Sequence, residues 1–121
     1  MAIQKSSTKT ALDLGNFESV VDEKLNSIFQ RLTKNQTTID KSISYALSNP
    51  GKRIRPTLVF LVGDFLGIET SRLESIAGAI ELIHTYSLVH DDLPCMDDDD
   101  LRRGKPTLHK KFNESTAVLA G

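Results

Sequence analysis

The chain has 121 residues, of which 39% are hydrophobic, and this suffices for one modest domain but not for a large enzyme with several cores. Its 15 basic and 16 acidic side chains give a net charge of −1, which excludes the polycationic footprint of a nucleic-acid-binding protein. No apolar run is long enough for a signal peptide or a membrane span, and Cys95 is the single cysteine, so we expect a cytoplasmic protein without an internal disulfide.

The first half of the chain predicts a lead-in followed by two helices. Residues 1–15 are polar and rich in Ser, Thr and Lys, and we expect them to be flexible. Residues 16–121 would then form a single domain. Apolar side chains recur at helical spacings with charges between them, which predicts a helix over residues 17–33. A weaker helical pattern covers residues 39–47, and the turn SNPGKRIRP ends it.

Two more apolar segments follow that turn. The run TLVFLVGDFLGI comes directly after Pro56, a residue favoured at the first helical position, and predicts a buried helix over residues 56–68. The next helix is predicted from Ser71 to Asp92, with Glu74 completing a candidate capping box at its start. No hairpin signal and no internal repeat is present, so the predicted fold class is all-α, with helices joined by short charged turns.

The segment LVHDDLPCMDDDDLRRGKP (residues 88–106) places six aspartates within ten positions and then changes sign. On the preceding helix His84 and Asp91 share one stripe, so we expect Asp91 to face inward at the helix end. Asp97 follows a proline-containing bend, and its carboxylate could return toward Asp91 and Asp92. Converging carboxylates repel one another unless a cation lies between them, and Mg²⁺ suits this position because it also binds water and phosphate.

Other interpretations of these charged motifs remain open on the residues alone. An aspartate run is usually a solvated acidic loop, although the long apolar helix before it and the pair Arg102 and Arg103 after it favour a site that grips phosphate. A calcium-binding EF-hand is disfavoured, because the run lacks the alternating ligand spacing, the central glycine and the terminal glutamate. The basic turn GKRIRP, taken alone, is as typical of exposed surface as of function.

The motifs GKRIRP (residues 51–56) and IELIHTYSLVHDDLPCMDDDDLRRGKPTLHKKF (residues 80–112) closely resemble, in order and spacing, the N-terminal part of the trans-isoprenyl diphosphate synthases. The resemblance implies the N-terminal portion of the all-α isoprenoid synthase bundle, Mg²⁺ as cofactor, and a homodimer when full length. It implies a prenyltransferase of isoprenoid biosynthesis that condenses isopentenyl diphosphate with an allylic diphosphate, dimethylallyl or geranyl. The family's second aspartate-rich motif is absent from this sequence, so we expect an N-terminal fragment that is inactive alone.

The resemblance also implies roles for individual residues. Asp91 and Asp97 match magnesium ligands, and Asp92 matches a ligand or a support for the allylic diphosphate. Arg102 matches a residue that grips the same diphosphate. The positions that match the isopentenyl diphosphate site are Lys52, Arg55, His84 and Arg103, with Arg53 as a helper. No side chain is needed as a nucleophile, because the cations stabilise the charge on the departing diphosphate.

Tyr86 bears on the length of the product. It precedes Asp91 by a turn and a half, where a large side chain in this family forms the floor of the pocket for the growing chain. This aromatic and the insertion of Pro94 and Cys95 resemble the bacterial farnesyl diphosphate synthases. The alternative is a geranylgeranyl diphosphate synthase, and the alternative for the ring itself is ordinary core packing.

Further alternatives concern the class of protein and the remaining histidines. A non-catalytic protein that binds magnesium diphosphate, or pairs with a complete subunit, is the second hypothesis. A terpene cyclase is disfavoured, because GKRIRP and the paired arginines would serve a second diphosphate that a cyclase does not use. Cys95 is expected to fill the loop, His90 to pack beside the site at the helix end, and His109 to be structural or on the surface.

Overall fold

The structure of the protein is a computed structural model that describes residues 14–49 and 51–121. Within these ranges the helices are α1 (Leu14–Leu32), α2 (Thr38–Ser48), α3 (Ile54–Phe65), α4 (Thr70–Asp91), α5 (Leu108–Lys111) and α6 (Glu114–Ala120), and the strands are β1 (Leu101–Arg102) and β2 (Lys105–Pro106). The all-α class is therefore confirmed. The predicted lead-in over residues 1–15 lies outside the described residues, apart from its last two, which already belong to α1.

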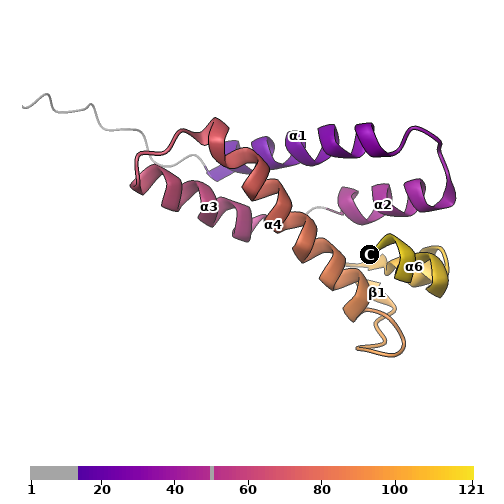
Figure 1. Cartoon of the computed structure of the whole chain (residues 1–121). Coiled ribbons are helices and arrows are strands. Elements are labelled where there is room, and N and C mark those ends of the chain that lie inside the picture. Colours follow the sequence, from indigo (N-terminus) through magenta and orange to yellow (C-terminus); the bar gives the residue numbers. More distant parts are fainter. Residues whose placement is uncertain (1–13, 50) are drawn as a thin grey trace, which may run out of the picture.

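The helices form two packed groups (Figure 1). In the first, α1, α3 and α4 enclose a core of buried apolar side chains, which are Val21, Leu25, Phe60, Leu73 and Ala77. In the second, the C-terminal half of α4 packs with α5 and α6 around Val89, Leu93, Leu108 and Ala117. Helix α4 takes part in both groups. Its C-terminal end, where the acidic loop begins, is therefore held in place by the packing of the second group.

The helix starts show where local sequence signals succeed and fail. Helix α2 begins with a capping box, in which Thr37 Oγ1 accepts from the Asp40 N–H at 3.2 Å and Asp40 Oδ2 accepts from the Thr37 N–H at 2.9 Å. The capping box predicted at Ser71 and Glu74 is wrong, because α4 begins one residue earlier with Glu69 as N-cap and without a side-chain cap. The first buried residue of α4 is Leu73, one turn into the helix.

Helix α3 corrects the prediction for the third segment. It begins at Ile54 rather than at Pro56, and only one side of it is buried. Its close approach to α4 depends on Gly63, where a Cβ atom would lie 2.0 Å from Leu73 Cδ1. Phe65, by contrast, is 89% exposed, so the expectation of a helix buried nearly all round is wrong for this chain.

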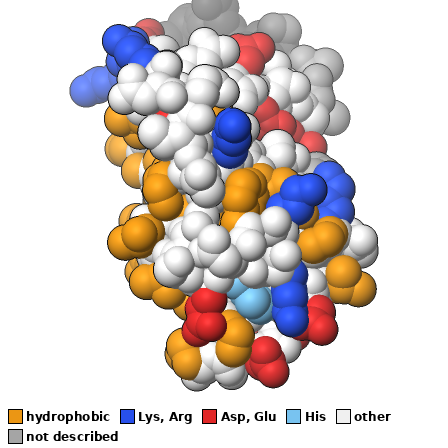
Figure 2. Space-filling view, turned by 90° about the vertical axis from the view of Figure 1, so that its right-hand side faces the viewer, with side chains coloured by type: hydrophobic (Ala, Val, Ile, Leu, Met, Phe, Trp, Pro, Cys, Tyr) orange, Lys and Arg blue, Asp and Glu red, His pale blue; other side chains and the backbone are white. Residues whose placement is uncertain are grey.

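Large apolar side chains remain exposed on α3 and α4 of the first group. They are Ile54, Leu58, Val62 and Phe65 on α3, and Ile76, Ile83 and Tyr86 on α4. Figure 2 shows one face on which hydrophobic side chains spread between scattered lysines and arginines. None of the helices described is both long enough and apolar enough to cross a lipid bilayer.

A small β-ribbon was not predicted. Strands β1 and β2 pair antiparallel, with Leu101 opposite Pro106 and Arg102 opposite Lys105. The two residues between them, Arg103 and Gly104, have φ of 50° and 76°, the positive values that a tight hairpin turn needs. The expectation that no hairpin is present is wrong, because strands of two residues carry no alternation that a sequence pattern could reveal.

Candidate functional site

Four of the residues that the sequence assigned to a diphosphate site line one small cavity. The cavity has a volume of about 80 Å³, and its lining includes Lys52, Arg55, His84 and Arg103. Lys52 lies in the turn before α3, and Arg55 lies in the first turn of α3. His84 belongs to α4, and Arg103 belongs to the ribbon turn. Because this grouping spans some fifty positions of sequence, it is produced by the fold and not by local clustering.

Arg55 and His84 are in direct contact within this cavity, with Arg55 Nη1 3.3 Å from His84 Nε2. Burial, together with the charges of Arg55, Arg102 and Arg103, holds the pKa of His84 below its ordinary value, against the opposing charge of Glu81. The neutral imidazole can accept a hydrogen bond from Arg55. A bound anion would favour the protonated form again, so His84 is suited to respond to a negatively charged ligand.

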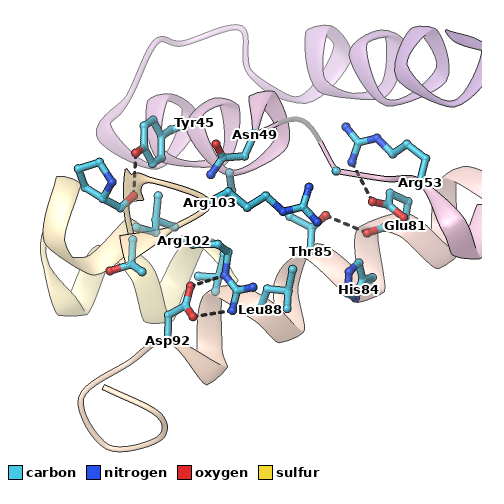
Figure 3. Close-up of a pocket in the computed structure, with 16 residues that line it drawn as sticks. Tyr45, Asn49, Arg53, Glu81, His84, Thr85, Leu88, Asp92, Arg102 and Arg103 are labelled. Carbon is cyan, nitrogen blue, oxygen red and sulfur yellow. Dashed lines mark hydrogen bonds and ion pairs between the residues drawn. The ribbon is translucent and has the colours of Figure 1, made fainter. Parts of the chain in front are cut away.

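Glycine at position 51 leaves room between two guanidinium groups. A Cβ atom on Gly51 would lie 3.4 Å from Arg53 Nη1 and 3.5 Å from Arg103 Nη1. Arg103 reaches this place from the ribbon turn, where it holds a left-handed backbone conformation (Figure 3). Glu81 Oε1 would lie 3.6 Å from the same Cβ atom, so a carboxylate lies beside the two guanidinium groups next to the backbone of the GKR turn.

Arg53, which the sequence analysis assigned as a helper of this site, lines the same cavity but is largely buried. Its side chain is 7% exposed, with Nη1 2.8 Å from Glu81 Oε1 and Nε 2.9 Å from Asp22 Oδ1. Burial opposes the charge, but the hydrogen bond to Glu81 and the charge of Asp22 raise the pKa of Arg53 above its usual range. Arg53 therefore holds the turn that presents Lys52 and Arg55, instead of adding a free cation to it.

Glu81 was missed by sequence reasoning. It is 3% exposed and joins α4 to the GKR turn through Arg53. A signal was present, because Glu81 falls one helical turn after the fully buried Ala77, where an unpaired carboxylate would be costly. A charged residue at that core-facing position indicates a buried basic partner.

Asp92 and Arg102 form a bidentate ion pair in a neighbouring pocket, which shares His84 and Arg103 with the first cavity (Figure 3). Arg102 Nε lies 2.9 Å from Asp92 Oδ2, and Nη2 lies 2.7 Å from Oδ1. These hydrogen bonds, against the effect of burial, raise the pKa of Arg102 above its usual range. Since both oxygens of the buried Asp92 are engaged, the geometry favours a supporting role for Asp92 over direct ligation of a metal ion.

The acidic loop folds back over the end of α4, as the sequence suggested. The Asp97 N–H donates to the Asp91 carbonyl at 2.8 Å, and the Asp99 N–H donates to the Asp92 carbonyl at 3.1 Å. Asp91 is only partly buried and Asp97 is exposed, so it is Asp92 that turns fully inward. A backbone hydrogen bond thus brings Asp97 beside Asp91, and both carboxylates are at least partly accessible to solvent.

Metal-ligating side chains also converge at a place that the sequence analysis did not consider. Across residues 14–49 and 51–121, the group of three or more that fits a single ion consists of Asp98, Asp100 and His109. His109, expected to be structural or on the surface, is buried. The three residues predicted as ligands or supports, Asp91, Asp92 and Asp97, do not form such a group with one another.

Tyr86 lines a separate and more apolar cavity of about 270 Å³. The other lining residues come from α2, α4, the end of α6 and the residue after it, and they are Ile43, Ala46, Leu47, Leu82, Ile83, Thr85, Val89, Ala120 and Gly121. The Tyr86 ring is 46% exposed and meets the His90 ring edge-to-face at 5.6 Å. His90 Nε2 lies 3.1 Å from the Val118 carbonyl, so His90 packs at the helix end, and Cys95 is exposed in the loop.

Comparisons with known proteins agree on one family. A family model described as polyprenyl synthetase matches residues 36–121. The chain is 57% identical over 84 residues to farnesyl diphosphate synthase of Bacillus subtilis, covering 69% of this chain and 28% of that protein. It is 46% identical over 109 residues to farnesyl diphosphate synthase of Haemophilus influenzae, covering 90% of this chain and 37% of that protein.

Other relatives differ in their product or are known as structures. Geranylgeranyl pyrophosphate synthase 11 of Arabidopsis thaliana is 46% identical over 111 residues, covering 88% of this chain and 31% of that protein. The crystal structure of a geranyltransferase from Legionella pneumophila matches with a TM-score of 0.83 at 45% identity, over 88% of this chain and 37% of that chain. The chain spans about a third of the length of the curated relatives it matches.

Proposed function

The chain belongs to the polyprenyl synthetase family, and from this premise we propose that it carries one half of the active site of a prenyltransferase. The proposed reaction condenses isopentenyl diphosphate with an allylic diphosphate, dimethylallyl or geranyl, to give farnesyl diphosphate. The observation that carries the proposal is the convergence of Lys52, Arg55, His84 and Arg103 on one cavity, next to the aspartates at the end of α4. Farnesyl diphosphate synthases are prominent among the relatives, which supports this product.

The basic cavity would hold the diphosphate of isopentenyl diphosphate. Arg55 and Arg103 can fork onto phosphate oxygens, Lys52 adds a compact positive charge, and His84 can donate once it is protonated. Such groups position the nucleophilic double bond without taking part in bond formation. At the other end, Asp92 fixes the guanidinium of Arg102, which leaves that arginine oriented toward an allylic diphosphate.

Mg²⁺ is the cofactor that we propose for this half-site. Asp91 and Asp97 fit this ion, because both offer only hard oxygen ligands and a backbone hydrogen bond brings Asp97 beside Asp91. Mg²⁺ uses few carboxylates and completes its shell with phosphate and water. When bound, the ion would neutralise the charge that develops on the departing diphosphate. The chain's own contribution is to hold Asp91 at a rigid helix end and to bring Asp97 back beside it.

Product length, the class of protein, assembly and location are further parts of the proposal. The relatives include geranylgeranyl diphosphate synthases, and a bulky Tyr86 in an apolar cavity favours the shorter farnesyl product. A magnesium-diphosphate binding protein without catalysis is the second candidate, and it would use the same basic cavity and aspartates. A terpene cyclase does not account for the basic turn GKRIRP together with the paired arginines Arg102 and Arg103, which would serve a second diphosphate. The homodimer implied by the family resemblance and the cytoplasmic location expected from the apolar pattern of the sequence stay predictions.

A chimera tests the proposed function. Residues 14–121 would replace the matching segment of the Haemophilus influenzae relative, and the product would be assayed with geranyl diphosphate, isopentenyl diphosphate and Mg²⁺. We expect farnesyl diphosphate, and a loss of about 100-fold or more in kcat/KM for Asp91→Ala. Glu18→Gln, an exposed change on α1, is the matched control.

The 121-residue chain gives a second arm of the same experiment. It should yield no product above a blank without protein, because the family's second aspartate-rich motif is absent from this sequence. Full activity of Asp91→Ala in the chimera would reject the metal assignment. Product formation by the 121-residue chain would reject the proposal that it carries only half of the active site.

A further inference from the structure

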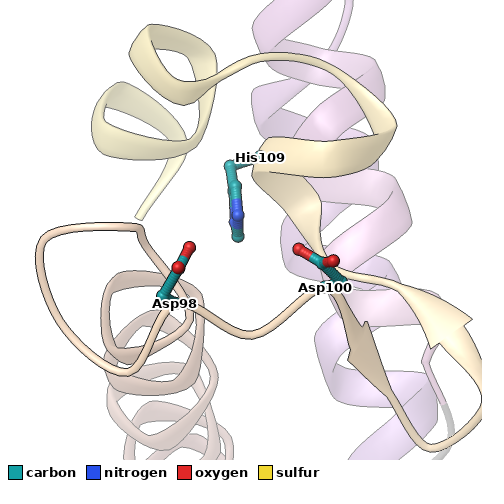
Figure 4. Close-up of side chains that lie close together, drawn as sticks. All are labelled: Asp98, Asp100 and His109. Carbon is teal, nitrogen blue, oxygen red and sulfur yellow. The ribbon is translucent and has the colours of Figure 1, made fainter.

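Asp98, Asp100 and His109 form a cluster that the proposed prenyl transfer does not use. One ligand atom from each lies within 4.8 Å of the other two. The two aspartates belong to the acidic loop, and the histidine belongs to α5. Figure 4 shows the imidazole directed into the gap between the two carboxylates. Two segments of the chain thus meet at a gap bordered by one nitrogen and several oxygens.

The buried histidine lacks a hydrogen-bonding partner on the side that faces this gap. His109 is 7% exposed, and its Nε2 atom is buried without a hydrogen-bond partner within the described part of the chain. Leaving a buried polar atom unsatisfied costs about 1–3 kcal/mol, so such atoms are rare without a cause. A bound ion between His109 and the carboxylates would provide one.

The contact of the other ring nitrogen, Nδ1, indicates which tautomer His109 adopts. Thr107 Oγ1 lies 2.7 Å from the Asp99 carbonyl and 3.2 Å from His109 Nδ1. The hydroxyl has one proton, and the short distance to the carbonyl indicates that it is donated there. Thr107 must then accept from the Nδ1 proton, which in the neutral ring leaves the lone pair of Nε2 toward Asp98 and Asp100. A ring fixed in this way by its distal nitrogen is typical of histidines that ligate metals.

The charges of the cluster also call for a cation. Two carboxylates and a nitrogen lone pair repel one another when nothing lies between them. Lys110 Nζ is 3.2 Å from Asp100 Oδ1, but this pair is exposed, at 50% and 70%, and it leaves His109 Nε2 unpartnered. The second oxygen of Asp100 remains available to an ion, and solvent can supply further ligands because both aspartates are exposed.

We propose that Asp98, Asp100 and His109 bind a Zn²⁺ ion that ties the acidic loop to α5. One imidazole nitrogen with two carboxylate oxygens suits zinc, whereas Mg²⁺ prefers oxygen ligands alone. The site is separate from the proposed magnesium site, because it shares no residue with Asp91 and Asp97. Its ion would be structural and would fix the path of the loop that presents Asp97.

Calorimetry with ZnCl₂ tests the site directly on the 121-residue chain, prepared without a histidine tag and with excess Mg²⁺ present. We expect saturable binding of one ion and a higher Tm in its presence. Asp98→Asn should weaken binding by about tenfold or more. Its fold should survive, because asparagine tolerates the φ of 52° at this exposed position. His109→Gln should weaken binding similarly.

Two controls separate this site from its neighbours. Asp99→Asn makes the same change of charge next to the cluster and should change the zinc affinity by less than about twofold. Asp91→Asn with Asp97→Asn removes the proposed magnesium ligands and should also leave zinc binding in place. The proposal is overturned if the folded chain shows no saturable binding, if Asp98→Asn and His109→Gln bind zinc as the parent does, or if the Asp91 and Asp97 changes abolish binding.

Discussion

Arg102 donates two hydrogen bonds, of 2.9 and 2.7 Å, to the carboxylate of Asp92, which lies ten residues earlier in the sequence. Asp92 ends α4 in a buried position, while Arg102 stands in strand β1 of the ribbon. The pair therefore joins the ribbon to the helix end and sets the span that the acidic loop must cover. Its effect is measurable on stability as well as on binding.

Replacing Asp92 should destabilise the fold, whereas replacing its neighbour should not. Asp92→Asn leaves Arg102 without its anionic partner in a half-buried position, and we expect the free energy of unfolding to fall by about 2–3 kcal/mol. Asp91→Asn changes the same charge at a partly exposed position and should cost under about 1 kcal/mol. Urea unfolding of both variants checks this, and equal losses would show that Arg102 does not discriminate between them.

Arg53 offers a second matched comparison, because one guanidinium has a buried and an exposed partner. Glu81 is 3% exposed and Asp22 is 52% exposed. Glu81→Ala should lower the free energy of unfolding by about 3 kcal/mol, since it leaves a buried arginine undercompensated. Asp22→Ala should lower it by about 1 kcal/mol or less. The reverse order in a denaturant titration would mean that the buried contact is not the one that holds the GKR turn.

His84 should titrate below its ordinary pKa of 6.5, chiefly because burial and the nearby arginines disfavour its charged form. Above pH 6.5 the ring is neutral in both the folded and unfolded chain, and its contribution to stability is fully present. As the pH falls through the lowered pKa, this contribution is lost, because the unfolded state takes up the proton more readily. Thermal unfolding across this window, compared with His84→Gln, measures the effect.

Inorganic pyrophosphate should reverse that shift. An anion beside His84 favours the imidazolium, so its pKa should rise on saturation, and pyrophosphate should bind more tightly as the pH is lowered toward 6. An NMR titration of the His84 ring signals, with and without pyrophosphate, gives both results. A titration curve that pyrophosphate leaves unmoved would remove His84 from the diphosphate site.

Two helical glycines should respond to alanine in opposite directions. A Cβ atom at Gly63 would collide with Leu73 at 2.0 Å, so Gly63→Ala should separate α3 from α4 and cost about 1–3 kcal/mol. At Gly78 the nearest atom is the flexible Lys24 Cγ at 3.4 Å, an ordinary contact. Gly78→Ala should be neutral or stabilise α4 by up to about 1 kcal/mol. Melting curves of the two variants suffice, and a stable Gly63→Ala protein would contradict the close packing.

Tyr86 should control product length in the chimera. Tyr86→Ala enlarges the apolar cavity, and we expect products longer than farnesyl diphosphate. Tyr86→Phe keeps the ring and should keep the farnesyl product, which separates the effect of volume from that of the hydroxyl. Chromatography of the dephosphorylated products distinguishes the outcomes. An unchanged product from Tyr86→Ala would reduce the ring to ordinary packing.

Helical periodicity predicted most of the fold, and its errors have physical causes. The segments predicted over residues 17–33, 39–47 and 71–92 match α1, α2 and α4 with small shifts at their ends. Helix α3 starts at Ile54, and Arg53 before it holds a φ of 49° in contact with Glu81 and Asp22. Those contacts are tertiary, and no local pattern encodes them.

The candidate site divides in the same way. The four basic residues carried recognisable motifs, and the structure places them around one cavity. Glu81 and His109 carried no motif, because each gains its meaning from residues on another element. His109 lies in the basic run HKK, where a surface position is the natural expectation, yet the fold buries it against Thr107 and the acidic loop.

The adjoining aspartates at the end of α4 are chemically identical but answer to different constraints. Asp92 is paired with one arginine of the same chain, so a change at this position deprives Arg102 of its partner. Asp91 is only partly buried, and its backbone carbonyl accepts from the Asp97 N–H, so its side chain remains accessible to whatever the protein binds. Of these two neighbouring aspartates, Asp92 thus depends on another residue of the same chain, whereas Asp91 is available to a bound ligand.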